Sequence, residues 1–153
     1  MSIEERLRQM GLELPEPSKP VASYVPCVRA GNLLFVSGQV PREKGVLRFS
    51  GHLGGNLNVE EGRQAARMCA LNGLSAVKQE LGTLERVRRI VKLTGFVASA
   101  AGFTDQPKVV DGASVFLVEL FGEKGQHARA AVGVNELPLG SAVELEMIVE
   151  VEP

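Results

Sequence analysis

The residues best suited to chemistry lie near the C-terminus, where an arginine precedes two strand-like segments. Arg129 stands in the string His-Ala-Arg-Ala-Ala-Val-Gly-Val, whose small side chains leave space around a planar guanidinium. A guanidinium offers a fixed fork of donors that matches a carboxylate at two points, which a lysine ammonium does less well. The string therefore indicates a site for a small anion. The alternative is a structural arginine paired with a glutamate of the last strand.

The elements that must position this arginine are two strands joined by a proline-containing turn. Residues 127–138 and 143–151 both alternate apolar and polar side chains. Glu144 is then either a ligand-facing carboxylate or one solvated member of an alternating set of glutamates. If the strands pair as a hairpin, one parity of the register places a set of residues on one face: Arg129, Ala131, Gly133, Glu144 and Glu146.

Upstream, strands alternate with helices. Apolar runs around a Gly-Asn turn predict a hairpin over residues 24–39. A helix is predicted over 59–81, with Asn58 as its N-cap, and a second from about 109 to 120. Between them, β-branched and aromatic residues over 87–98 predict a strand that is buried on both faces.

The order β-β-α-β-α-β-β predicts an α+β fold in which both helices pack on one face of the sheet. The other face should still carry apolar side chains, such as the alternating set of residues 143–151. We expect oligomerisation through the sheet to cover them. The chain of 153 residues, 44% of them hydrophobic, fits a single domain, 1–153, in which residues 1–20 form a short helix and a proline-rich extension.

Composition argues against several classes of partner. Seventeen basic and eighteen acidic residues give a net charge of −1, and aromatic residues make up 5%, so no nucleic-acid partner is expected. The basic cluster of residues 86–89 is predicted to be a solvated corner. Cys27 and Cys69 lack metal-ligand spacing, and the two histidines lie far apart, so neither a metal nor a cofactor is expected. Without a signal peptide or a bilayer-length apolar run, we expect a cytoplasmic protein with no membrane partner.

Three parts of the chain together resemble the Rid family of YjgF-like reactive-intermediate deaminases. They are Tyr24, the string from Gly31 to Pro41, and the segment from Arg129 through a Leu-Pro pair to Glu146. The resemblance covers residues 20–151. It implies a chorismate-mutase-like α+β protomer with a mixed sheet, assembled as a homotrimer with sites in the clefts between protomers.

The resemblance also implies roles for particular residues. The family's arginine, which binds the carboxylate of an enamine or imine, falls on Arg129. The glutamate credited with placing the attacking water falls on Glu144, and the pocket's tyrosine and serine fall on Tyr24 and Ser37. The implied reaction hydrolyses the imine to a keto acid and ammonia, which requires little beyond an oriented water and a proton path.

Two positions depart from the family pattern. A cysteine often found two residues beyond the arginine is Ala131 here, and a pocket asparagine appears as Asp111, which adds negative charge beside a carboxylate site. These departures favour an alternative function, in which the cleft binds a keto acid or related metabolite without turnover and regulates a partner enzyme. A third function, endoribonuclease activity, is attached to relatives of the family, but the charge and the low aromatic content argue against it.

Simpler interpretations stand beside the functional ones. Ser37 has no histidine near it in sequence, so we expect its hydroxyl to form hydrogen bonds and not to act as a nucleophile. The alternative is a serine that merely ends a strand. Tyr24 either walls the pocket or packs in the core. His127 either flanks the site or, as we prefer, faces solvent from a loop, and His52 is predicted to belong to a turn.

Overall fold

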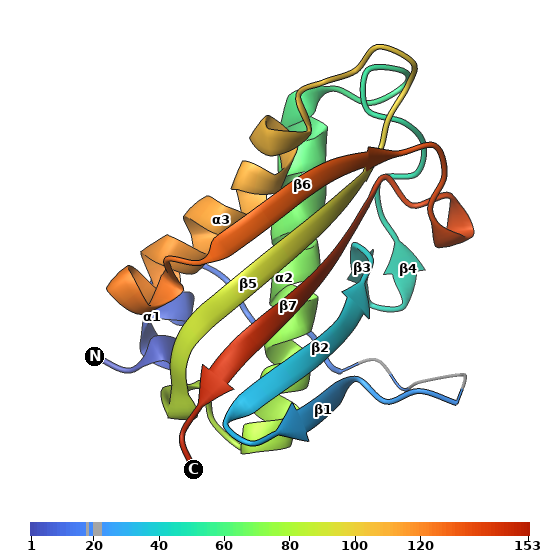
Figure 1. Ribbon diagram of the computed structural model, residues 1–153. Coiled ribbons are helices and arrows are strands. Elements are labelled where there is room, and N and C mark those ends of the chain that lie inside the picture. The colour runs from blue at the N-terminus through green and yellow to red at the C-terminus, as the bar shows by residue number, and fades with distance from the viewer. Residues whose placement is uncertain (18, 20–22) are drawn as a thin grey trace.

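One sheet forms one layer of the protein, and two long helices form the other layer (Figure 1). The computed structural model describes residues 1–17, 19 and 23–153. The helices are α2 (Val59–Leu81) and α3 (Gln106–Phe121). In spatial order the five strands are β1 (Cys27–Ala30), β2 (Leu33–Gln39), β7 (Val143–Val151), β5 (Val87–Ala98) and β6 (Ala128–Val134). This confirms the predicted α+β class, with a mixed sheet and both helices on one face.

The last two strands do not form the expected hairpin, because β5 lies between them. β5 pairs with β6 in parallel and with β7 antiparallel. A parallel pair needs a crossover connection, and α3 supplies it by carrying the chain from β5 back to the start of β6. β6 therefore occupies the sheet edge beside β5, and β7 takes the other side, paired with β2. The connection between β6 and β7 contains a 3₁₀ turn, Pro138–Gly140.

The predicted bounds of α2 are confirmed by its caps. The Asn58 side chain accepts a hydrogen bond from the backbone N–H of Glu61, whose own side chain accepts one from the backbone N–H of Asn58. This reciprocal box satisfies two donors that the first turn leaves unpaired. Gly82 ends the helix in the left-handed region, with φ of 85°, where a residue without Cβ is favoured.

The apolar side chains are distributed over the two faces of the sheet differently from the prediction. The alternating set of β7 that runs from Val143 to Val151 packs against the helices and is buried, so it does not line the open face. β5 is also buried mainly on its helix side, while Lys92 is exposed on the other. The open face instead carries apolar residues from three strands: Val28, Leu33, Phe35 and Val132.

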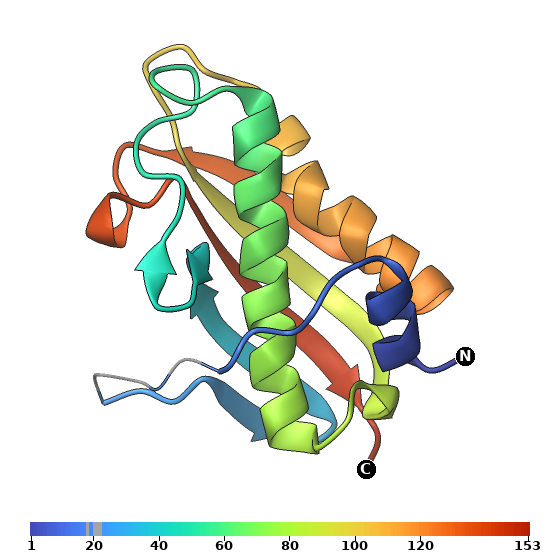
Figure 2. The same cartoon turned by 180° about the vertical axis from the view of Figure 1, so that it is seen from behind.

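The N-terminal segment packs on the helix layer, as Figure 2 shows from behind. Helix α1 (Ile3–Gln9) buries Leu7 and donates a hydrogen bond from Arg6 to the carbonyl of Leu120 in α3, 2.8 Å away. The chain then crosses α2, where the Ser75 hydroxyl donates to the carbonyl of Pro15. A two-stranded ribbon that was not predicted, β3 (Arg42–Glu43) and β4 (Val46–Leu47), follows β2.

No helix among the residues that the structure describes is both long and apolar enough to cross a bilayer.

The helices pack closely against each other at a glycine of α3. A Cβ built on Gly112 would lie 2.1 Å from the backbone carbonyl oxygen of Arg63 in α2, which cannot rotate away. We therefore predict that Gly112→Ala destabilises the fold by about 1 to 3 kcal/mol, because the helices must separate. Urea unfolding at equilibrium measures this change. Val115→Ala, on the exposed side of the same helix, serves as control, and equal midpoints for the two variants would contradict the prediction.

Candidate functional site

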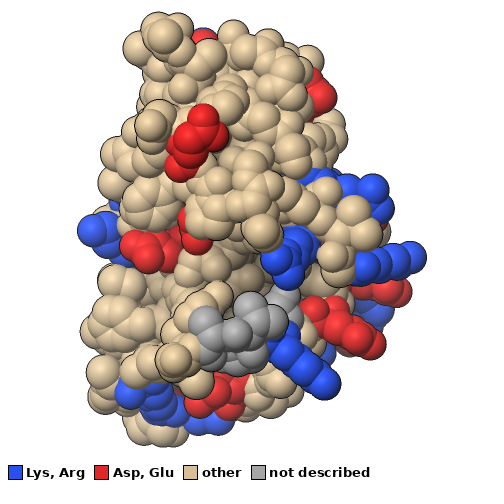
Figure 3. Space-filling model, turned by 90° about the vertical axis from the view of Figure 1, so that its right-hand side faces the viewer, with Lys and Arg blue, Asp and Glu red and all other residues tan. Residues whose placement is uncertain are grey.

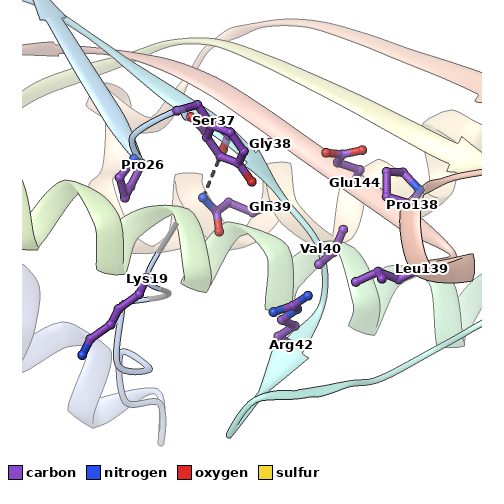
Figure 4. Close-up of a pocket in the computed structure, with 11 residues that line it drawn as sticks. Lys19, Pro26, Ser37, Gly38, Gln39, Val40, Arg42, Pro138, Leu139 and Glu144 are labelled. Carbon is purple, nitrogen blue, oxygen red and sulfur yellow. Dashed lines mark hydrogen bonds between the residues drawn. The ribbon is translucent and has the colours of Figure 1, made fainter. Parts of the chain in front are cut away.

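A cavity of about 210 Å³ lies on the β2 side of the sheet, where the segment before β1 meets the turn after β6 (Figure 4). Three predicted site residues line it: Tyr24, Ser37 and Glu144. Tyr24 is 58% exposed, so its packing in the core is excluded. The cavity is also lined by Lys19, by Arg42 of the short strand β3 and by Leu139 of the 3₁₀ turn.

Ser37 has a structural task at the wall of this cavity. Its hydroxyl donates to the carbonyl of Val25 at 2.6 Å, and its own carbonyl accepts a hydrogen bond from the Gln39 side chain at 3.1 Å (Figure 4). The hydroxyl thus ties β2 to the segment that carries Tyr24. Among the described residues, the acceptor of this hydroxyl is the Val25 carbonyl, and its role toward a ligand stays a prediction.

Glu144 points from β7 into the cavity. It passes directly over Gly38, where a Cβ would lie 2.4 Å from the carboxylate oxygen Oε1. Half-burial raises the pKa of this carboxyl above its ordinary value of 4.5, and the nearby charge of Glu146 raises it further. A carboxyl whose pKa is moved toward neutrality is better matched to exchanging a proton with water or substrate.

Arg129 lies elsewhere, on the edge strand β6, and faces α3. Its Nη1 donates to Oδ1 of Asp111 at 2.7 Å and to Oγ of Ser114 at 3.2 Å. The arginine side chain is 24% exposed and the aspartate 42%, so the pair is not a dry interior ion pair. The alternative of an arginine paired with a glutamate of the last strand is wrong, because the acidic partner comes from α3. Ala131, two residues further on, is half-buried.

The predicted common face for these residues is also wrong. Arg129 aligns with the buried Leu93 of β5, on the helix side, whereas Glu144 aligns with Phe96 on the open side. The space beside Gly133 is filled by Gln106 of α3 and not by Glu144. The hairpin assumption caused the error, since β5 intervenes and sets the register of both neighbours.

The structure thus divides the predicted site residues into two groups at opposite sides of one chain. One group lines the cavity near β2, and the other lies at the β6 edge, with β7 and β5 between them in the sheet. Within the described residues, Arg129 does not line the cavity that holds Glu144. The first group is Tyr24, Ser37 and Glu144, and the second is Asp111, Arg129 and Ala131.

Sequence reasoning missed two features of these groups. His127 does not face solvent freely: its Nε2 is 2.8 Å from the Ser114 hydroxyl and its Nδ1 is 2.6 Å from the Gly125 carbonyl. The spacing of Asp111 and Ser114, three residues on a helix, signals a shared face and could have revealed the pairing. Arg42, in contrast, reaches the cavity from β3, a two-residue strand that is too short to carry a periodic signal.

The described part of the chain holds no cluster of residues that would support metal or thiol chemistry. No group of three or more His, Cys, Asp or Glu side chains gathers there. Burial raises the pKa of the Cys27 thiol to about 11, with a further contribution from Glu80, and Cys69 is fully buried, so both thiols are neutral. The face in Figure 3 carries basic and acidic side chains in separate small groups, with no continuous basic surface.

Comparison with known proteins places this geometry in a family. Residues 4–151 match the model described as "YjgF/chorismate mutase-like, putative endoribonuclease". The chain is 45% identical to protein TCP17 of Trypanosoma cruzi, over 97% of this chain and 93% of that protein. It is 28% identical to a 2-iminobutanoate/2-iminopropanoate deaminase of Dermatophagoides farinae, over 92% and 95%. A crystal structure described as a putative endoribonuclease from Shewanella oneidensis superposes with a TM-score of 0.96 at 36% identity, covering 99% and 100%.

The raised pKa of Glu144 has a consequence for stability. The folded state binds the proton of Glu144 more tightly than the unfolded chain does. The protonated carboxyl therefore adds to the free energy of unfolding below pH 4.5, and this stabilisation is lost as pH rises through the folded pKa. We predict that Glu144→Gln, which cannot ionise, gains stability relative to the native protein as pH is raised from 4 to 7. Urea unfolding at several pH values tests this. Glu150→Gln on the same strand is the control, and a difference independent of pH would contradict the prediction.

Proposed function

The chain belongs to the YjgF/chorismate mutase-like family, and from this premise we propose that it hydrolyses a small enamine or imine that bears a carboxylate, releasing a keto acid and ammonia. One observation carries the proposal: Arg129 at the β6 edge and the Glu144 carboxyl in the cavity, each half of such a site, lie at opposite sides of the same chain. Two copies placed edge to cavity would complete the site. A relative named as a 2-iminobutanoate/2-iminopropanoate deaminase supports the class of reaction.

The proposed assembly is the homotrimer that the family resemblance implies. Each chain has one edge and one cavity to offer, and a closed ring of three uses all of them. The open face of the sheet supports it. Phe35 is 43% exposed and Val132 is 42% exposed on that face. In a monomer these apolar side chains contact water, and packing against another chain would remove them from it. A trimer that turns these faces inward would bury them and bring the β6 edge of one copy toward the cavity of the next.

Arg129 is proposed to hold the substrate carboxylate. Its Nη1 is engaged by Asp111, while its Nε and Nη2 donate to none of the described residues. Since the pair is partly exposed, it contributes only about 0 to 1 kcal/mol, and a ligand carboxylate can share the guanidinium with Asp111. The negative charge of Asp111 weakens the binding of an anion but also holds the guanidinium in one orientation.

Glu144 is proposed to activate the water from the other wall of the cleft. Its carboxylate takes a proton from water as the water oxygen adds to the imine carbon, and it returns that proton to the nitrogen. The raised pKa of this carboxyl suits both transfers. The reaction needs no further electrophile, because a protonated imine is itself reactive.

A second candidate function is the binding of a keto acid without turnover, which would regulate a partner enzyme. Two observations favour it: Ala131 supplies no thiol, and Asp111 competes for Arg129. Endoribonuclease activity appears in the names of the matched family and of the Shewanella protein. The net charge of −1 and the mixed charges of the face in Figure 3 do not favour it.

The first test concerns the arginine. We predict that Arg129→Ala lowers kcat/KM for 2-iminopropanoate by about 100-fold or more, because loss of a charged partner at a binding site costs about 2 to 5 kcal/mol. The rate of keto acid release, with the imine generated in the assay, measures this. Arg67→Ala, on the exposed side of α2, is the matched control. An unchanged rate in Arg129→Ala, with the fold verified by circular dichroism, would exclude the proposed role.

The second test concerns the assembly. We predict a solution mass of three 16.4 kDa chains for the native protein and of one chain for Phe35→Glu, since the new carboxylate would be buried in the shared face. Light scattering coupled to size-exclusion chromatography measures both. Val118→Glu, on the outer side of α3, should remain trimeric. A native protein that elutes as a monomer would refute the assembly, and with it the shared site.

A further inference from the structure

Four polar side chains form a chain of contacts on the α3 side of the β6 edge. Arg129 donates to both Asp111 and Ser114, at 2.7 and 3.2 Å. The Ser114 hydroxyl is 2.8 Å from Nε2 of His127, and Nδ1 of His127 is 2.6 Å from the carbonyl of Gly125. The predicted roles of Arg129 and Asp111 leave Ser114 and His127 without a task in the reaction.

The contacts determine where the protons are. A carbonyl oxygen only accepts, so Nδ1 of His127 must carry hydrogen and donate to Gly125. The Ser114 oxygen accepts a hydrogen bond from Arg129, and a guanidinium has no lone pair to accept one in return. The hydroxyl hydrogen of Ser114 is therefore free to point at Nε2 of His127. Nε2 of a neutral imidazole is then an acceptor. A hydroxyl whose proton points at a fixed imidazole nitrogen is the arrangement that moves protons in hydrolytic sites.

The position of this pair relative to the ligand follows from the chemistry of the substrate. In an imino acid the reacting carbon is bonded directly to the carboxylate carbon. A carboxylate held by Arg129 therefore brings the reacting carbon to the same guanidinium that the Ser114 oxygen contacts. Ser114 and His127 are both half-buried, so solvent only partly competes for the pair.

We infer that Ser114 and His127 form a proton-accepting pair for the second half of the reaction, the breakdown of the carbinolamine. This rests on the proposed function. The Ser114 oxygen takes the proton of the carbinolamine hydroxyl while its own proton passes to Nε2 of His127. The C=O bond forms, the C–N bond breaks, and ammonia leaves with the electron pair. The imidazolium then gives its proton to ammonia, which restores neutral His127 and releases ammonium.

The experiment compares the only two histidines of the chain. His127→Gln keeps a polar side chain that cannot take a proton, and kcat should fall about 100-fold or more, the usual size of such an effect. The affinity for the keto acid product should stay within about twofold, since Arg129 is intact. Ser114→Ala should show the same loss of kcat. Added imidazole should raise the rate of the His127→Ala variant about tenfold. If the histidine were merely structural, imidazole would not restore activity.

His52→Gln is the matched control, because that ring bonds the Asn135 carbonyl at 2.9 Å and lies outside the network, so it should keep the native rate. A native kcat in His127→Gln, a loss explained by weaker keto acid binding, or no response to imidazole would overturn the assignment alone. A native protein that does not hydrolyse the imine at all would overturn the proposed function, and the assignment with it.

Discussion

Two helices cover one face of the sheet only, and this one-sided packing determines where each chemical group lies. The alternating apolar residues of β7 and β5 turn toward α2 and α3, so the glutamates of β7 must turn toward the open face. The crossover through α3 places β6 at the sheet edge and turns Arg129 toward that helix. Arg129 and Glu144 are thus separated within each chain, and the proposed packing between chains would bring them together.

The site is sparse, and its electrostatics differ on its two walls. On the cavity wall, burial disfavours the ionised form of Glu144 and raises its pKa. On the edge wall, Asp111 neutralises part of the charge of Arg129 while fixing its direction. A guanidinium held in this way is oriented before a ligand arrives, which reduces the entropy lost on binding.

Much of the fold could be predicted from the sequence, because its signals are local. Asn58, Gly82 and the stretch between them define α2 through capping and helix propensity, and the Gly-Asn turn defines the first hairpin. The pairing of β6 with β5 could not be predicted, since strand neighbours depend on contacts between distant segments. The same limit misplaced Arg129 and Glu144 on one face and sent the apolar set of β7 to the wrong side. His127 was misjudged because one partner, Ser114, lies on α3, 13 residues earlier in the chain.

The central claim is that Arg129 of one copy and the Glu144 cavity of another hold one ligand between them. A crystal structure of the full chain with a small 2-keto acid tests this most directly. We expect electron density for the ligand between two chains, with its carboxylate on Nε and Nη2 of Arg129 and its keto carbon facing Glu144 of the neighbouring copy. Density confined to a single chain, or a ligand that avoids Arg129 altogether, would contradict the claim.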